Sequence, residues 1–243
     1  MARVSSPRKL VAIVLAGGRG TRLFGPQGGP KWLFTLNGRP LIDYSLSAIR
    51  VARVDEIAIV VRDDDFVLRS KYPDFAQIAD EGNGTFSAVL AAAEYAVDRQ
   101  ANAVITSCDL VCAPMAAKAL VESASRNPDW LASFGVTTIA NDQSPIWVHS
   151  NASGRIVNYG KQIESSEYAF ASIRFATLAF LQMALTSAKA VPDHVDTDTK
   201  LMRHLIVNEG VIAGSVNIGD ALDVDDEADA KVAEKISRSF RHT

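Results

Sequence analysis

A glycine-rich loop that carries two arginines is the segment of this chain best suited to bind a phosphate group. It follows the apolar run 10–15 and reads Leu15-Ala16-Gly17-Gly18-Arg19-Gly20-Thr21-Arg22-Leu23. Glycines let the backbone approach an anion closely and offer it N–H groups. The guanidinium groups of Arg19 and Arg22 add charge-assisted donors for phosphate oxygens. The loop therefore predicts a phosphorylated ligand, and a plain turn between a strand and a helix is the alternative.

Two well-known phosphate-binding loops do not fit this chain. A P-loop requires G-x-x-x-x-G-K-[ST], but Gly160-Lys161 is followed by Gln162 and lacks the upstream glycine. The dinucleotide fingerprint G-x-G-x-x-G would begin at Gly18, and Leu23 stands at its third glycine position. The broken dinucleotide fingerprint disfavours an NAD(P)-dependent dehydrogenase.

Charged residues are distributed unevenly along the chain. The first 42 residues carry seven basic side chains and no acidic one, whereas residues 219–229 carry six acidic side chains and no basic one. A polyanion at the basic segment and a cation at the acidic segment would suit this pattern. A solvated tail and a solvated loop are the alternative. The net charge of −3 is too small to indicate nucleic-acid binding.

The elements around the loop are expected to alternate between strands and helices. Apolar runs at 10–15, 56–61 and 103–107 predict buried parallel strands, and helices are expected at 40–49, 85–97 and 114–125, with Thr85 as a cap. This order predicts an α/β fold with a Rossmann-like, open and mostly parallel sheet that has helices on both faces.

The second half of the chain has a different pattern, which predicts a small mixed β/α part. Strands are expected at 131–138, 145–150, 155–159 and 211–217, and helices at 175–187, 199–208 and 227–237. No linker rich in Pro, Ser or Gly divides the chain. We therefore expect a flexible tail over residues 1–9 and a single domain over residues 10–243.

Hydropathy and cysteine content indicate the compartment. The longest apolar run, Leu10 to Ala16, has seven residues, and a membrane-spanning helix needs about 20. Glycines follow this run instead of a signal-peptide cleavage site. Cys108 and Cys112 have no further cysteine with which to form a zinc cluster. These features predict a cytoplasmic protein with no membrane partner.

The glycine loop is part of a longer motif. It continues into Pro30-Lys31 and then Leu36-x-Gly38-x-Pro40-Leu41. The whole pattern resembles the signature of the nucleotidyltransferase superfamily that makes nucleoside-diphosphate sugars and related activated alcohols. The resemblance implies that Arg22 and Lys31 contact the phosphates of an NTP and that a loop wraps this NTP, namely Leu15, Ala16, Gly17, Gly18, Arg19, Gly20 and Thr21.

The same resemblance implies a Mg²⁺ site. Asp109 ends the third predicted strand, where the family carries a metal-binding aspartate, and Cys108 replaces the usual preceding glycine. The segment 223–229 resembles the family's D-x-D-T-P-E-D, which puts Asp225 at the second metal-binding aspartate. The alternative role of Asp109 is a helix cap, that of the acidic segment is a charged helix N-terminus, and Asp223 is the alternative ligand. Two carboxylates with water and phosphate suit Mg²⁺.

Two further matches concern the acceptor and the base. Gly154-Arg155-Ile156, followed by Gly160-Lys161, resembles the G-x-I…E-K segment of the sugar-phosphate branch, so Lys161 would hold the acceptor's phosphate; a solvent-exposed lysine is the alternative. Gly84-Thr85 resembles the G-T pair near the base and ribose. Ala79 stands where the family has its base-reading glutamine, so the base stays open.

The implied reaction is Mg²⁺-dependent: NTP and a sugar phosphate, or a similar phosphorylated small alcohol, give an NDP-sugar and pyrophosphate. Arg22, Lys31 and Lys161 would be its catalytic residues. Residues 10–125 would bind the NTP and residues 126–243 the acceptor. A cofactor-biosynthesis guanylyltransferase or cytidylyltransferase of the same superfamily and a non-catalytic nucleotide-binding protein are the alternatives. The oligomeric state stays open, a homodimer included.

Overall fold

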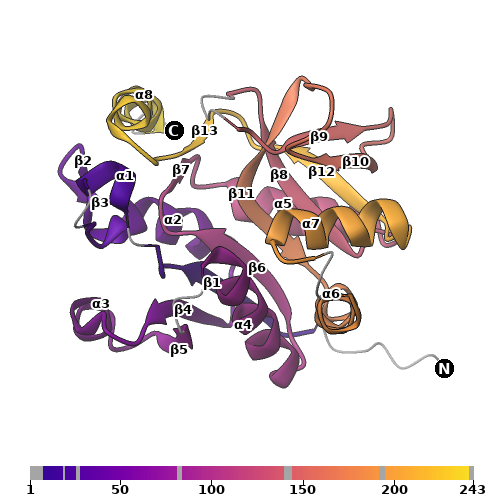
Figure 1. Ribbon diagram of the computed structural model, residues 1–243, viewed down its shortest axis with the longest axis horizontal. Coiled ribbons are helices and arrows are strands. Elements are labelled where there is room, and N and C mark those ends of the chain that lie inside the picture. The colour runs from indigo at the N-terminus through magenta and orange to yellow at the C-terminus, as the bar shows by residue number, and fades with distance from the viewer. Residues whose placement is uncertain are drawn as a thin grey trace.

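The computed structural model describes residues 8–18, 20–25, 28–80, 84–139, 144–191 and 195–240. In these segments a nine-stranded mixed sheet runs through the molecule, with helices packed on both of its faces (Figure 1). This arrangement confirms the predicted α/β fold class.

The first half of the chain supplies the parallel part of the sheet. Its strand order is β6 (Asn102–Ser107), β1 (Leu10–Leu15), β4 (Glu56–Arg62) and β5 (Ala76–Asp80). The four central residues of β1 are fully buried because they alternate between the two sides, each covered by helices. One side is covered by α4 (Thr85–Asp98), and the other by α2 (Leu41–Arg50) and α5 (Ala116–Arg126).

The second half of the chain continues the same sheet in a mixed manner. Strand β11 (Tyr168–Ala176) runs antiparallel to β6 and joins β8 (Ala132–Thr137) and β9 (Trp147–Ser150). Beyond them lie β10 (Ile156–Gly160) and β12 (Ala213–Asn217). The helical elements are α6 (Leu178–Ala190) and α7 (Asp198–Arg203), which continues as the π-helical turn His204–Asn208.

Smaller elements surround one edge of the sheet. They are α1 (Thr21–Phe24), the 3₁₀ turn Lys31–Leu33, the hairpin β2 (Thr35–Leu36) and β3 (Arg39–Pro40), α3 (Phe66–Lys71), the ladder of β7 (Leu110–Cys112) with β13 (Ala221–Asp223), and α8 (Glu227–Ser239). Helix α8 lies beside the hairpin (Figure 1), and Asn37 Nδ2 donates to Ser237 Oγ over 2.8 Å. The C-terminal helix therefore packs on an N-terminal segment.

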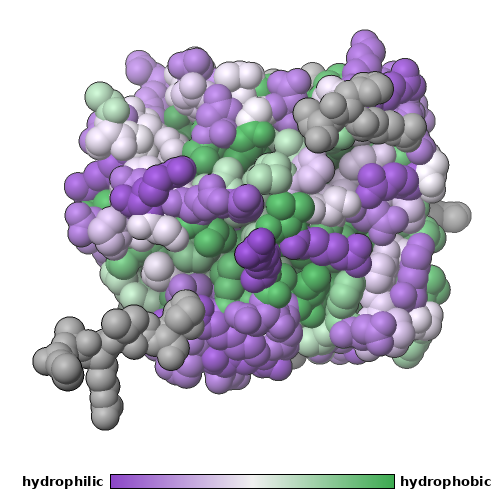
Figure 2. Space-filling model, turned by 180° about the vertical axis from the view of Figure 1, so that it is seen from behind, coloured by the Kyte–Doolittle hydropathy of each residue, from purple (hydrophilic) through white to green (hydrophobic). Residues whose placement is uncertain are grey.

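The surface is mostly hydrophilic around the rim of the face shown in Figure 2, and apolar residues show mainly towards its centre. Among the described helices, none is both long enough and apolar enough to span a lipid bilayer.

Several local predictions were wrong. Phe175 and Ala176 were assigned to a helix but end β11, and the helix begins at Leu178 with Thr177 as its N-cap. Strand β11 escaped prediction because it is covered on both faces and carries the buried Arg174, which obscures the alternation of polar and apolar residues. Helix α4 has Gly84, not Thr85, as its N-cap.

The sequence also gave no sign of strand β5 or helix α3, and the helix expected over 199–208 changes to π-helical geometry at residue 204. Residues 1–7 of the expected tail lie outside the described residues. Lys9, which was assigned to that tail, accepts a hydrogen bond from Asn102 N over 2.9 Å and pairs with Glu56 over 2.6 Å.

Candidate functional site

A cavity of about 520 Å³ opens at the carboxyl ends of β1 and β6, where ligands bind in open parallel sheets. Most of the residues singled out from the sequence line it: Leu15, Gly17, Gly18, Gly20, Thr21, Arg22, Lys31, Gly84, Thr85, Asp109, Lys161 and Asp225. Ala16 is buried, and its N–H donates to Val60 O over 2.8 Å. Arg19 lies outside the described residues.

Two glycines of the loop are required by close contacts. A Cβ atom on Gly17 would lie 2.7 Å from Asp80 Oδ2. Gly20 has a φ of 58°, and its Cβ would lie 2.7 Å from the carbonyl oxygen of Gly29. Because a larger residue would force the loop or its neighbours to move, glycine keeps the backbone close to the edge of the cavity.

The lining of the cavity includes a cluster of opposite charges. Lys31 Nζ donates to Asp109 Oδ2 and to Asp225 Oδ1. Arg22 Nη2 donates to the second oxygen, Asp225 Oδ2, over 2.8 Å. The Lys31 and Asp109 side chains are each 12% exposed, whereas that of Arg22 is 66% exposed. The ammonium is therefore enclosed by the carboxylates, and the guanidinium closes the cluster from the solvent side.

An antiparallel ladder brings the two aspartates together. Asp223 pairs with Leu110 in β13 and β7, and one step beyond, Val224 N donates to the carbonyl oxygen of Asp109 over 3.1 Å. Asp109 follows β6 of the parallel sheet, whereas Asp225 follows β13, which lies outside the main sheet. The β7–β13 ladder therefore brings the two carboxylates together.

The start of α8 explains why Asp225 is free to face Lys31. Asp226 is the N-cap and forms a capping box with Asp229, whose carboxylate also accepts from Asp225 N over 3.0 Å. The alternative role as helix-terminal charges therefore belongs to Asp226 and Asp229. Asp109 caps no helix either, since α5 has Met115 as its N-cap.

The charges in the cluster stabilise one another. Burial by itself would lower the pKa of Lys31, but the charges of Asp109 and Asp225 outweigh it and raise the pKa above its ordinary value. Burial would raise the pKa of Asp109, and the charge of Lys31 reverses this and lowers it. Lys31 is therefore an ammonium and Asp109 a carboxylate at neutral pH.

A third carboxylate, Asp223, lies beside the cluster. It accepts hydrogen bonds from Ser107 Oγ, over 3.0 Å, and from Ser172 Oγ. Burial and the charge of Asp109 raise its pKa to about 7. Ser172 has a φ of 46° at an irregularity of β11 between Phe170 and Arg174, a strained backbone of the kind that often occurs in functional sites.

Three polar residues that line the cavity were missed from the sequence: Asp80, Ser107 and Ser172. Asp80 ends strand β5 and Ser172 lies in β11, and neither strand was predicted. Ser107 is the last residue of a strand that was predicted, so its place at the carboxyl edge was an available signal.

The donor set fits a Mg²⁺ ion that arrives with phosphate. One oxygen each of Asp109 and Asp225 contacts the same cationic atom, Lys31 Nζ, so these oxygens can share a cation. Over the segments that the structure describes, His, Cys, Asp and Glu side chains form no metal-binding group of three or more. Mg²⁺ often takes only one or two carboxylates and completes its shell with water and substrate phosphates.

Lys161 follows β10 and lines the cavity with an exposed side chain. A smaller hollow of about 70 Å³ adjoins the cavity and shares Ile146, Ser172, Asp223 and Asp225 with it. Neither Lys161 nor the glycine loop lines this hollow, which extends the cavity beside Asp223 and Asp225.

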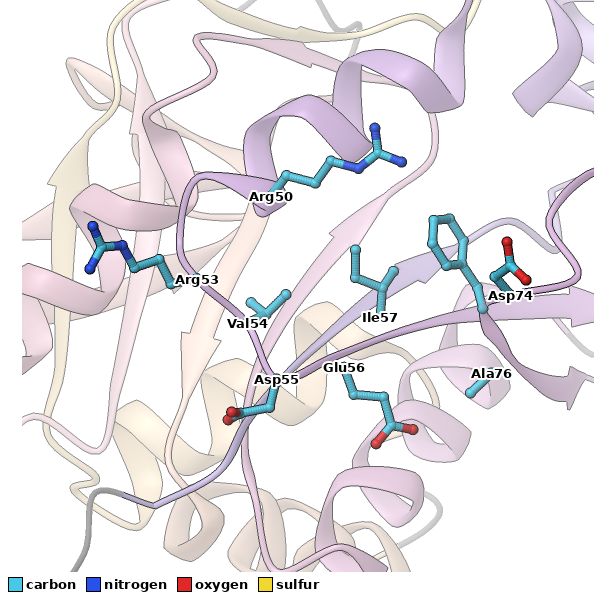
Figure 3. A pocket seen from close by; sticks show the side chains of 9 residues that line it. Arg50, Arg53, Val54, Asp55, Glu56, Ile57, Asp74 and Ala76 are labelled. Carbon is cyan, nitrogen blue, oxygen red and sulfur yellow. The ribbon is translucent and has the colours of Figure 1, made fainter.

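A hollow of about 510 Å³ lies elsewhere, at the amino ends of β4 and β5 (Figure 3). Its charged side chains point in different directions: the guanidinium groups of Arg50 and Arg53 lie far apart, and Asp55 and Glu56 point to a third side. Glu56 is already paired with Lys9 and Arg99. Because these charges do not converge, this hollow lacks the arrangement found at the glycine loop.

The family profile of the MobA-like NTP transferase domain matches residues 12–163, more than half of this 243-residue chain. The chain belongs to this family. The match includes the glycine loop, Lys31, Asp109 and Lys161, whereas Asp225 lies beyond it. The MobA-like NTP transferase domain thus accounts for most of the cavity lining, and Ser172 of β11 with Asp223 and Asp225 adds the rest.

Curated relatives match this MobA-like domain over parts of their length. It is 35% identical over 122 residues to the bifunctional protein GlmU of Caulobacter vibrioides, covering 47% of this chain and 26% of that protein. It is 42% identical over 57 residues to a probable molybdenum cofactor guanylyltransferase of Thermococcus gammatolerans, covering 23% of this chain and 28% of that protein. The chain thus spans about a quarter of the length of these relatives.

Solved structures resemble the whole MobA-like chain. The inositol-1-phosphate CTP transferase from T. maritima superposes with a TM-score of 0.73 at 21% identity, covering 96% of each chain. A putative glucose-1-phosphate thymidylyltransferase from Bacillus anthracis, in complex with a sucrose, superposes with a TM-score of 0.77 at 14% identity, covering 94% of this chain and 95% of that one. At these identities the likeness concerns the fold.

Proposed function

We propose that this protein is a Mg²⁺-dependent nucleotidyltransferase that joins an NTP to a phosphorylated small alcohol, such as a sugar phosphate, and releases pyrophosphate. The observation that carries the proposal is the cluster of Lys31, Asp109 and Asp225, which lines the same cavity as the glycine loop. It places cationic donors for phosphates beside carboxylates for a metal, in one cavity. Family membership over residues 12–163 supports the same activity.

The reaction needs little beyond charge and position. A phosphate monoester has a second pKa near 6, so the acceptor is largely dianionic at pH 7 and needs no general base. The barrier comes from bringing two polyanions together and from charge on the leaving pyrophosphate. Mg²⁺ bound by Asp109 and Asp225 would supply positive charge that reduces the repulsion between the two polyanions and stabilises the leaving pyrophosphate.

The side chains divide this work in the proposed scheme. Arg22 and Lys31 bind the β- and γ-phosphates, and the loop at Gly17 and Gly18 offers backbone N–H groups. Lys161 holds the acceptor's phosphate across the cavity. Residues 10–125 then bind the NTP and residues 126–243 bind the acceptor.

The test is pyrophosphate release from each of the four common NTPs with Mg²⁺ and a panel of acceptors. The structural neighbours suggest inositol 1-phosphate and glucose 1-phosphate as first acceptors, and the guanylyltransferase relative adds molybdenum cofactor. We expect turnover with one NTP and one acceptor, which identifies base and substrate together. Binding of an NTP without turnover on any acceptor in a broad panel would favour a non-catalytic nucleotide-binding protein instead.

A further inference from the structure

The ammonium of Lys31 contacts carboxylates in this structure, although the proposed function assigns it to the phosphates of an NTP. It contacts one oxygen of Asp109 and one of Asp225, the two carboxylates proposed for the metal. The side chain is 12% exposed, so these carboxylates supply contacts that water does not. In this state the lysine occupies the place between the two metal-binding groups.

An ammonium and a divalent cation cannot share these two oxygens. If both were bound to the same two oxygens, the ammonium and the divalent cation would lie only a few ångströms apart and would repel each other strongly. A metal that enters must therefore move Lys31 away. A buried ammonium that leaves its carboxylates needs other anions nearby, because stranding it without a partner is strongly unfavourable.

The phosphates of an NTP are the anions suited to receive the lysine. Lys31 and the glycine loop line the same cavity, and the nearest atom to a Cβ on Gly18 is Lys31 Cδ, at 3.9 Å. A phosphate group at the loop would thus lie beside the lysine stem. The highly exposed Arg22 can likewise exchange Asp225 for phosphate at little cost.

We propose that Lys31 is a tethered counter-ion that holds Asp109 and Asp225 together in the free protein and excludes the metal until an NTP arrives. Mg²⁺ then enters with the nucleotide, and Lys31 transfers to the phosphates. This inference rests on the proposed function. It adds a positioning role for Lys31 and an order of binding.

The experiment uses EPR to measure the affinity of the protein for Mn²⁺, which serves as a spectroscopic substitute for Mg²⁺. Each protein is titrated alone and with the α,β-methylene analogues of the four NTPs, which cannot release pyrophosphate. We expect the wild type to bind Mn²⁺ weakly alone and tightly with an analogue. Lys31→Met should bind Mn²⁺ alone at least roughly tenfold more tightly than the wild type, because a unit positive charge has left the site.

Two variants control for other causes. Lys9→Met removes a lysine that pairs with Glu56, away from the cavity, and should leave Mn²⁺ affinity unchanged. Asp225→Asn in the Lys31→Met background should abolish the gain, because the metal loses one carboxylate. Circular dichroism checks folding, and Lys31→Gln replaces Lys31→Met if the latter does not fold.

The outcomes separate the two proposals. Equal Mn²⁺ affinity of the wild type and Lys31→Met without nucleotide overturns the counter-ion role, even where an analogue promotes metal binding. Tight binding of Mn²⁺ to the wild type alone overturns it too. Failure of every analogue to promote Mn²⁺ binding by the wild type instead counts against the proposed function.

Discussion

Arg22 Nη2 lies 2.8 Å from Asp225 Oδ2, although 203 positions separate the two residues in the chain. The contact joins the basic N-terminal segment to the acidic C-terminal segment. Because the arginine is largely exposed, the pair contributes only about 0–1 kcal/mol to stability. Its significance is positional: both charges face the cavity that a nucleotide and its metal would fill.

Replacement of Lys31 should impair catalysis. We expect Lys31→Ala to lower kcat at least about 100-fold at saturating NTP, as loss of one transition-state charge donor commonly does. Steady-state pyrophosphate release measures this. Near-normal turnover would show that Lys31 serves the carboxylates and not the phosphates.

Lys161 should affect the acceptor more than the nucleotide. Lys161→Ala is expected to raise the KM of the acceptor much more than that of the NTP, because in the proposed scheme this lysine binds the acceptor's phosphate. Lys118→Ala is the matched control, since Lys118 pairs with Glu122 on α5 and does not line the cavity. A change confined to the KM of the NTP would contradict the assignment.

Asp109 and Asp225 should behave as one unit. Each single change to Asn is expected to abolish most metal-dependent turnover, and the double variant should be little worse than either single variant. The measurement is pyrophosphate release over a Mg²⁺ titration. Fully additive losses, or an unchanged Mg²⁺ dependence in Asp225→Asn, would shift attention to Asp223 as the ligand.

The glycine loop offers a matched pair of substitutions. Gly17→Ala puts a methyl group 2.7 Å from Asp80 Oδ2 and should lower stability by about 1–3 kcal/mol. Gly18→Ala meets only Lys31 Cδ at 3.9 Å and should change stability by less than about 0.5 kcal/mol. Denaturant unfolding without ligand compares them. Equal effects would mean that the close approach at Gly17 does not constrain the loop.

Acid should weaken an ion-pair cluster far from the cavity. Hydrogen bonds from Lys9 and Tyr95, with a smaller contribution from Arg99, outweigh the opposing effect of burial and lower the pKa of Glu56 to about 2 from its usual 4.5. Since the folded pKa is the lower one, the stabilisation is complete above pH 4.5 and is lost as the pH falls towards 2.

Glu56→Gln tests this pH dependence. After allowance for solvent screening, it should cost about 1–2 kcal/mol at pH 7, with the difference from wild type shrinking below pH 4.5. Urea unfolding at pH 7, 5, 4 and 3 follows it. A difference that stays constant over this range would assign the loss to packing and not to the carboxylate charge.

The sequence by itself determined the first strand, the glycine loop and the strands β6, β1 and β4 of the parallel half of the sheet, but not β5. These features depend on local chemistry: a buried apolar run, glycines where a close approach or a positive φ is needed, and helices between strands. The signature at Pro30-Lys31 indicated the family for the same reason, since its residues lie close together in the chain.

Only the tertiary structure decided which charges meet. Lys31 and Asp225 lie 194 positions apart, and their contact depends on the β7–β13 ladder, a long-range pairing that the local pattern does not predict. Ser172 lines the cavity because it lies in β11, a strand that was not predicted from the sequence since both of its faces are covered. Long-range pairing reflects the packing of whole elements, so a pattern read over a few residues could propose the carboxylates but not their partner.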